Sequence, residues 1–141
     1  MPHDPELVAE TRGWLARAHA DLASGRAGLA VQPPLTGDVV FHAQQAAEKA
    51  MKGLLTWHSR VFRRTHNLTE LGEQCARLDP TLEPLLRRAS TLTDYAWKFR
   101  YPGEPDEPPR GEAEEALALA REVYEQILAR LPRDVAPSSN G

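Results

Sequence analysis

Apolar residues recur every three or four positions along most of the chain, and this spacing predicts helices. The first helix is expected over residues 4–29, where Asp4 suits the N-cap and Pro5 suits the first helical position, because no N–H donor is needed there. Pro33 and Pro34 close it. Its expected buried stripe consists of Leu7, Thr11, Trp14, Ala18 and Leu22.

The second helix is expected over residues 39–58, with Asp38 as its N-cap. Its apolar face is predicted to contain Val40, Ala43, Ala47, Met51, Leu54 and Leu55. Residues 59–65 form a basic connection to a short third helix over residues 68–78. Asn67 followed three residues later by Glu70 has the spacing of a capping box.

The recurring apolar residues predict a fourth helix over residues 82–99. Pro84 is compatible with this helix because it lies near the start. Residues 102–109 carry four prolines, a glycine and three acids, which predicts an exposed loop. A last helix follows over residues 112–131. The sequence therefore predicts an all-α fold: a four- to five-helix up-and-down antiparallel bundle forming one domain over residues 1–131, with residues 132–141 as a disordered tail.

Composition agrees with one globular domain, since 41% of the 141 residues are hydrophobic and 26% are charged. Cys75 cannot form an internal disulfide, because it is the only cysteine, and we interpret it as a small packing residue. No apolar run is long enough to span a bilayer, and the first residues do not resemble a secretory signal. We therefore expect a cytoplasmic protein without a membrane partner.

Charge is unevenly distributed along the chain. The net formal charge is −3, but residues 36–101 carry +3 and residues 102–141 carry −5. An anion site is therefore expected in the middle of the sequence. No pair of cysteines, HExxH arrangement, Walker loop or nucleophile elbow occurs, so neither a metal site nor a cofactor is expected.

A polar strip follows the second helix opposite its apolar face. Spacings of three, four and three place four side chains on one side: His42, Gln45, Lys49 and Lys52. An imidazole, an amide and two ammonium groups suit a phosphate or an acidic partner. The alternative is a solvated helix face that Glu48 neutralises.

Two further clusters could bind anions. Arg60, Arg63, Arg64 and His66 precede the third helix, and arginine matches phosphate oxygens in a bidentate manner. The alternative is a basic surface loop. At the end of the fourth helix, aromatic and basic side chains could stack on a base and hold its phosphate, or could pack in the core or in a dimer: Tyr95, Trp97, Lys98, Arg100 and Tyr101.

Three segments in register resemble the HEPN domain: FHAQQAAEKAMKGLL (41–55), THNLTEL (65–71) and DYAWKFRYPG (94–103). The opening helix, with Trp14 and Asp21-Leu22, is also similar to that family, so the resemblance covers about residues 8–130. It implies a helical bundle, a frequent homodimer, and a companion nucleotidyltransferase in a toxin–antitoxin or nucleotide-handling pair. The binding groups that it implies are His42, Gln45, Lys49, Lys52, His66, Tyr95, Arg100 and Tyr101; we add Arg64 from the basic connection.

The sequence departs from the ribonuclease members of the wider superfamily in one respect. Those proteins carry an arginine followed, after four to six residues, by a histidine, whereas residues 101–106 after Arg100 contain none. The first hypothesis is therefore a module without catalytic activity that binds nucleotide or RNA, or docks a nucleotidyltransferase. The second is a metal-independent ribonuclease toxin that uses Arg100 with His66 or His42 from another element. Arg60 with His66 is an improvised pair of the same kind, and a structural helical adaptor is the third hypothesis.

Overall fold

The computed structural model describes residues 3–103 and 106–137, and within these ranges it contains helices and no strand. The all-α prediction is therefore confirmed. The helices are α1 (Pro5–Ala30), α2 (Thr36–Trp57), α3 (Leu68–Leu78), α4 (Glu83–Ala89) and α5 (Arg110–Leu128). Three short 3-10 helices accompany them: η1 (Pro80–Leu82), η2 (Ser90–Ala96) and η3 (Arg133–Val135). None of the helices is long and apolar enough to cross a membrane, within the part of the chain described.

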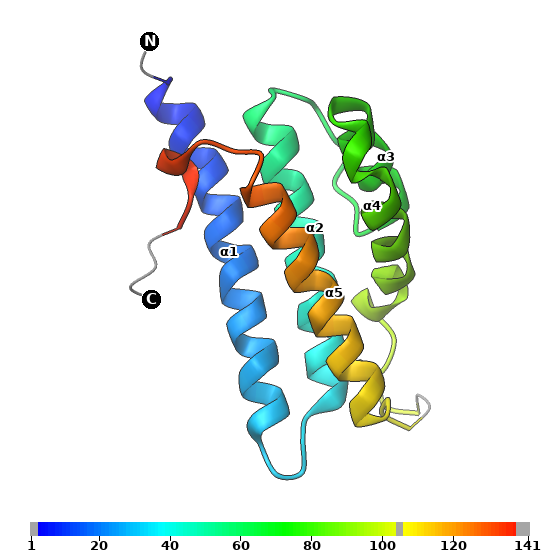
Figure 1. Ribbon diagram of the computed structural model, residues 1–141. Coiled ribbons are helices and arrows are strands. Elements are labelled where there is room, and N and C mark those ends of the chain that lie inside the picture. The colour runs from blue at the N-terminus through cyan, green and yellow to red at the C-terminus, as the bar shows by residue number, and fades with distance from the viewer. Residues whose placement is uncertain (1–2, 104–105, 138–141) are drawn as a thin grey trace.

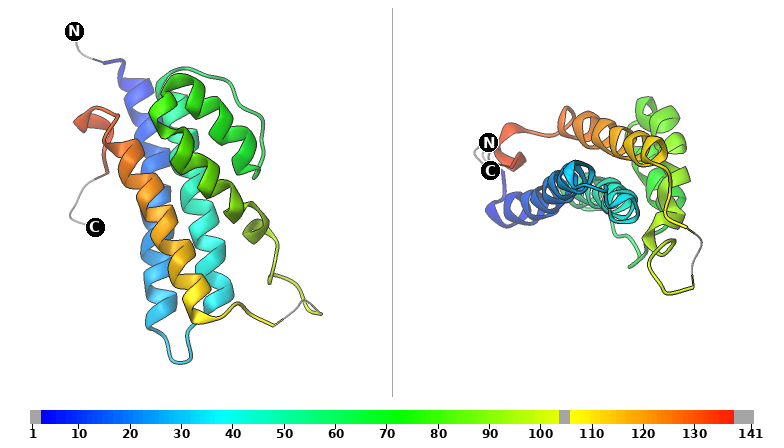
Figure 2. Two further views of the ribbon diagram at one scale, coloured as in Figure 1. Left: turned by 45° about the vertical axis from the view of Figure 1, so that its right-hand side comes forward. Right: turned by 90° about the horizontal axis from the view of Figure 1, so that it is seen from below.

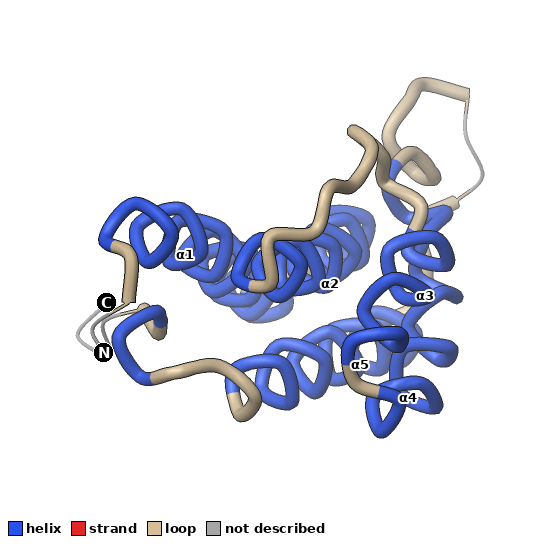
Figure 3. Tube along the Cα trace, turned by 90° about the horizontal axis from the view of Figure 1, so that it is seen from above, coloured by secondary structure: helices blue, strands red, loops and turns tan. Residues whose placement is uncertain are grey.

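The second helix lies at the centre of the bundle. It contacts α1, α3, α5 and η2, and Figure 1 shows it behind α5, with α1 on one side and α3 and α4 on the other. The view along the bundle in Figure 3 shows the same arrangement. As a result, α2 is buried around most of its circumference rather than along one stripe.

Small side chains permit this burial. Ala43, Ala46, Ala47 and Ala50 are fully buried along α2, so neighbouring helices can approach it closely from several sides. Larger side chains fill the remaining space at Met51, Leu54 and Leu55, as the apolar pattern predicted. Burying each of these large side chains stabilises the fold by about 1.5–3 kcal/mol.

The connection between α2 and α3 folds back along the bundle. His66, near its end, contacts Glu48 in the middle of α2, and Cys75 of α3 contacts the backbone of Met51. Figure 2 shows this connection leaving the top of α2 and descending along the outer side of α3 to the point where α3 begins. The third helix therefore starts beside the middle of α2, which departs from a simple alternation of antiparallel neighbours.

Two of the N-caps predicted from the sequence are confirmed. Asp4 caps α1 by accepting a hydrogen bond from the Glu6 amide, and Asn67 caps α3 by accepting from Thr69 and Glu70. The prediction that Asp38 caps the second helix is wrong. The helix begins at Thr36 with Leu35 at the N-cap, and Asp38 lies in the first turn, where a carboxylate still interacts favourably with the helix dipole.

Two predicted segments differ from the structure. The fourth helix is not continuous over residues 82–99: it is divided into η1, α4 and η2, which ends at Ala96. The last helix begins two residues earlier than expected, at Arg110. The tail is not disordered over residues 132–137, because η3 buries Val135 and Asp134 contacts α1 at Arg12. Residues 138–141 lie outside the described residues.

We predict that Gly28→Ala destabilises the protein. A Cβ at Gly28 would lie 2.9 Å from Cγ2 of the buried, β-branched Val39, so one of the two helices must shift. Overpacking of this kind costs about 1–3 kcal/mol, which exceeds the gain in helix propensity. Urea denaturation should show a lower free energy of unfolding.

Gly13→Ala is the matched control in the same helix, because a Cβ there meets no atom within 4 Å. It should stabilise the protein by about 0.5–1 kcal/mol. Equal effects of the two substitutions would contradict the close approach of α1 and α2.

Candidate functional site

The polar strip of α2 (His42, Gln45, Lys49 and Lys52) begins with a carboxylate shared by two of its members. Asp21 of α1 accepts from Nδ1 of His42 at 2.8 Å through Oδ1 and from Nζ of Lys49 at 2.6 Å through Oδ2. Asp21 is buried, with only 8% of its surface exposed. An ionised carboxylate can only accept, so Nδ1 of His42 carries the proton and Nε2 is directed elsewhere.

A second buried carboxylate organises the rest of the strip. Glu48 is 3% exposed, and it accepts from Nζ of Lys52 at 3.0 Å and from Nδ1 of His66 at 2.7 Å. Gln44 donates to both Glu48 and the backbone oxygen of His66, at 3.1 Å each. Gln45 donates to Gln44 at 2.6 Å, so the amide of the strip joins the same network.

Aromatic rings cover the ammonium group of Lys52. It lies 5.5 Å from the ring centre of Trp14 and 5.8 Å from that of Phe62, which is in the connection to α3. Such cation–π contacts, together with Glu48, compensate for the loss of water around the charge. Trp14 is thus only half-buried and serves this site, rather than belonging to the buried stripe predicted for α1.

The segment after η2 brings Arg100 onto the start of α2. Phe99 adopts a left-handed backbone conformation (φ 67°), which is unfavourable for a bulky residue and reverses the chain direction. The guanidinium carbon of Arg100 then lies 3.8 Å from the ring centre of Phe41. One of its terminal nitrogens is 3.6 Å from Oδ1 of Asp38. Phe41 in turn contacts His42, with 5.5 Å between ring centres.

The remaining predicted residues lie around this surface with different surroundings. Tyr95 is half-buried and donates to Glu112; burial, followed by this hydrogen bond, raises the pKa of its phenol. Tyr101 is 64% exposed and Arg64 is exposed. Tyr95 is therefore directed toward α5, whereas Tyr101 and Arg64 remain accessible.

The structure thus forms two sets of contacts along α2. One runs from Arg100 through Phe41 and His42 to Asp21 and Lys49, and the other joins Gln45, Lys52 and His66 around Glu48. Sequence reasoning missed that Asp21, Gln44 and Phe41 hold these groups. A signal existed for Asp21: it occupies a helical position between the buried residues Ala18 and Gly25, where an acid needs a partner.

The sequence profile of the HEPN domain matches residues 11–131, and these residues include every side chain of the site. The chain belongs to the HEPN domain family. This family is generally associated with nucleotides or RNA, and its domains often form dimers. Searches of curated proteins and of solved structures find no match.

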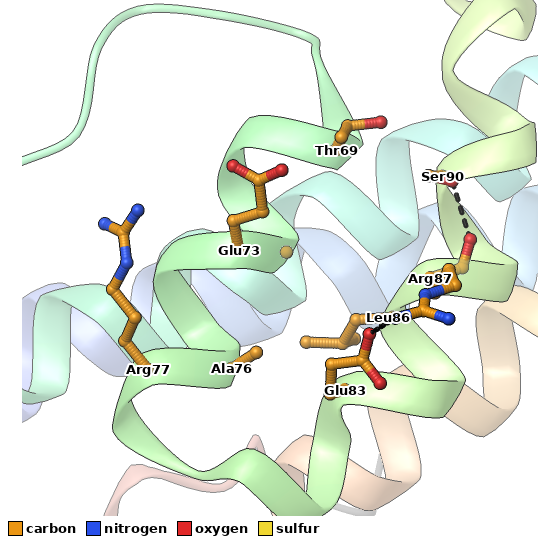
Figure 4. Close-up of a pocket in the computed structure, with 9 residues that line it drawn as sticks. Thr69, Glu73, Ala76, Arg77, Glu83, Leu86, Arg87 and Ser90 are labelled. Atoms are coloured by element: carbon orange, nitrogen blue, oxygen red, sulfur yellow. Dashed lines mark hydrogen bonds and ion pairs between the residues drawn. The ribbon is translucent and has the colours of Figure 1, made fainter.

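The HEPN domain also has a hollow of about 430 Å³ between α3 and α4. Figure 4 shows Ala76 of α3 opposite Leu86 of α4, with Arg87 paired to Glu83. None of the predicted site residues lines it, so it is separate from the strip.

Cys75 of α3 is fully buried, and burial raises the pKa of its thiol to about 12. The thiol is therefore protonated at neutral pH, as expected for a packing residue. No group of three or more potential metal ligands from His, Cys, Asp or Glu occurs among the residues described.

We predict that Glu48→Gln strongly destabilises the HEPN domain. The substitution leaves the ammonium of Lys52, whose side chain is 8% exposed, without a counter-charge. Breaking a buried pair by removing one partner costs about 3–5 kcal/mol. Thermal and urea unfolding measure the loss.

Glu83→Gln is the matched control, because Glu83 pairs with Arg87 at the surface. It should change the free energy of unfolding by less than about 1 kcal/mol. The double variant Glu48→Gln/Lys52→Met should be more stable than Glu48→Gln alone, since no charge remains buried there. A loss at Glu48 no larger than at Glu83 would contradict the role of this carboxylate.

Proposed function

We propose that this HEPN domain binds the phosphate of a nucleotide or of RNA at the surface formed by the polar strip of α2 and Arg100. The observation that carries the proposal is the position of Arg100, whose guanidinium lies over the ring of Phe41. A guanidinium supported by an aromatic face is oriented before a ligand arrives, while its N–H groups can still donate to phosphate oxygens.

The charged side chains around the strip are matched in number, so protonation of the histidines decides its net charge. Asp21 and Glu48 each contact one lysine and one imidazole, so the two acids do not exceed the two cations. Arg100 adds a further charge, and among the described carboxylates Asp38 is the one that approaches it, at 3.6 Å. With Asp38 counted, three acids face three cations, so this surface is neutral in formal charge while both imidazoles are neutral, and it becomes positive when either imidazole is protonated.

Each histidine directs one free ring nitrogen, which accepts a hydrogen bond in the neutral ring and donates one when the ring is protonated. In His42 and His66, Nδ1 is held by a carboxylate, and Nε2 makes no hydrogen bond within the described residues. Each ring therefore presents one nitrogen to a ligand. The side chain of His66 is 63% exposed, compared with 29% for His42, so His66 is the more accessible of the two.

Arg100→Lys tests this proposal. The charge is retained, but the planar group over Phe41 and its bidentate geometry are removed, so affinity for ATP and for a short single-stranded RNA should fall about tenfold, or 1.4 kcal/mol. Arg100→Ala should weaken binding further. Fluorescence anisotropy or isothermal titration calorimetry measures both.

Arg110→Lys is the control, because Arg110 is an exposed arginine that pairs with Glu114 on α5. It should leave affinity unchanged. The proposal fails if neither ATP nor RNA binds the unaltered protein at micromolar concentration, or if the two lysine variants behave alike.

We also infer the partners that fit such a module: a second copy of the chain, and a companion nucleotidyltransferase in a toxin–antitoxin-type pair. Family membership supports the second copy, because HEPN domains often form dimers, and the nucleotidyltransferase is inferred from the resemblance of the sequence motifs. Sedimentation of the protein alone, and co-purification with a nucleotidyltransferase encoded beside it, test the two partners separately.

A second candidate function is metal-independent RNA cleavage, and one observation favours it. Asp21 fixes the ring of His42 through Nδ1, which is the arrangement that makes Nε2 an effective base. His42 would remove the proton from a ribose 2′-hydroxyl, whose oxygen bonds to the phosphorus as the bond to the 5′-oxygen breaks, while Arg100 stabilises the added negative charge. The departing 5′-oxygen takes a proton from water, and the His42 imidazolium returns its proton to solvent. His66, oriented by Glu48, is the other imidazole for this role.

Cleavage of a labelled RNA in the presence of a chelator tests this function. His42→Asn should reduce the rate at least a hundredfold if His42 is the base. His19→Asn is the control, because His19 lies beside Tyr124 and away from the strip. Absence of cleavage by the unaltered protein would eliminate catalysis and leave the binding function intact.

A further inference from the structure

A hollow of about 290 Å³ lies between the connection and the end of α3, outside the site described above. Its lining consists of Arg60, Val61, Gln74, Arg77 and Leu78. The volume is several times the roughly 30 Å³ that one water occupies in the liquid, so a phosphate group fits.

The charge of this hollow distinguishes it from three others on the described surface. The hollow between α1 and α5 also has two arginines, Arg26 and Arg121, but three glutamates line it as well. The hollow between α3 and α4 likewise contains glutamates. The hollow beside Phe62 adjoins this one through Val61, Gln74 and Arg77, and its own lining includes Glu70 and Glu73. In the hollow at Arg60 and Arg77, none of the described carboxylates contributes to the lining.

The two arginines are available to a ligand. Both are exposed, and neither forms an ion pair within the part of the chain described. Arg77 also borders the hollow beside α4, but Figure 4 shows it projecting away from Glu83 and Arg87, toward the side of α3 along which the connection runs. Its guanidinium is therefore directed to the side of α3 on which Arg60 lies.

Hydrogen bonds that do not involve the guanidinium groups of Arg60 and Arg77 hold the walls of the hollow in place. Gln74 donates to the backbone oxygen of Val61 at 3.0 Å, and Arg63 binds Glu70 through two hydrogen bonds of 2.8 and 3.0 Å. Val61 is 91% exposed and provides an apolar contact at the rim. A pre-formed hollow of this kind loses little conformational entropy on binding.

The same connection leads from the hollow to the polar strip. Arg60 lies at the hollow, Arg64 is exposed midway, and His66 joins the network of Glu48. Six extended residues span at most roughly 20 Å. The hollow and the strip are therefore within the reach of one short polynucleotide.

We propose that the hollow at Arg60 and Arg77 binds a backbone phosphate of a single-stranded RNA whose neighbouring nucleotides follow the connection to the polar strip. The inference rests on the proposed function and names its ligand class: an extended strand, not a mononucleotide. Two arginines match phosphate oxygens, and the exposed Val61 contacts a sugar or base.

Binding of ATP and of a single-stranded RNA of about 12 nucleotides tests the inference. The strand should bind at least tenfold more tightly than ATP at low salt. Arg60→Ala and Arg77→Ala should each weaken binding of the strand at least fivefold and change ATP affinity less than twofold. The slope of log affinity against log salt should fall by about 0.7 for each phosphate that the variant no longer binds.

Arg121→Ala is the charge-matched control, because Arg121 lines the acidic hollow between α1 and α5. Arg60→Ala is the cleaner of the two variants: Arg77 also lies in the last turn of α3, where a cation stabilises the helix dipole, whereas Arg60 lies outside any helix. Unchanged melting temperatures for Arg60→Ala confirm that its effect is on binding.

Three results would overturn the inference. If the strand binds no more tightly than ATP, or if Arg60→Ala and Arg77→Ala match Arg121→Ala, the hollow is not on the path of a ligand, and the proposed function at Arg100 still stands. If neither ATP nor the strand binds, the proposed function fails and this inference fails with it.

Discussion

Two carboxylates in the interior, Asp21 and Glu48, make the architecture of this HEPN domain feasible. The central helix is buried on most sides, yet it carries two lysines and a histidine. Cationic groups can leave water only when an opposite charge and hydrogen bonds replace it. Asp21 provides this from α1, and Glu48 provides it from α2 itself while also binding His66. The same two groups therefore fasten α1 and the connection before α3 to the central helix.

This arrangement determines the character of the proposed binding surface. Lys49 and Lys52 are held at fixed positions by their acids, so they contribute shape and a local field more than unpaired charge. Further polar groups come from the edges: Arg100 over Phe41, and Nε2 of two imidazoles, which donates only when the ring is protonated. The left-handed turn at Phe99, which is unfavourable for a bulky side chain, is the backbone feature that delivers Arg100. The unfavourable backbone conformation of Phe99 and the burial of Asp21 and Glu48 thus both position groups of this surface.

Residues 101–106, which follow Arg100, contain no histidine, so the cleavage proposal depends on an imidazole from another element whereas the binding proposal does not. The imidazoles that the fold does bring to the strip come from other elements, and each is oriented by a buried carboxylate. A surface with oriented donors fits phosphate recognition without requiring a reaction. The connection extends this recognition from the strip to the arginine hollow, so one segment links both parts of the proposed RNA path.

The sequence alone determined the helical class, the cap at Asn67 and the set of polar residues on the second helix, because these depend on periodicity and on neighbours within one turn. It did not determine that Asp38 lies inside the helix, that the fourth helix is divided, or that residues 132–137 pack against α1. Nor could it place Arg100 on Phe41, or assign Lys49 and Lys52 to different acids. Those features depend on which surfaces meet in space: a strip of given charge looks the same in the sequence whether water or a buried carboxylate from elsewhere in the fold faces it.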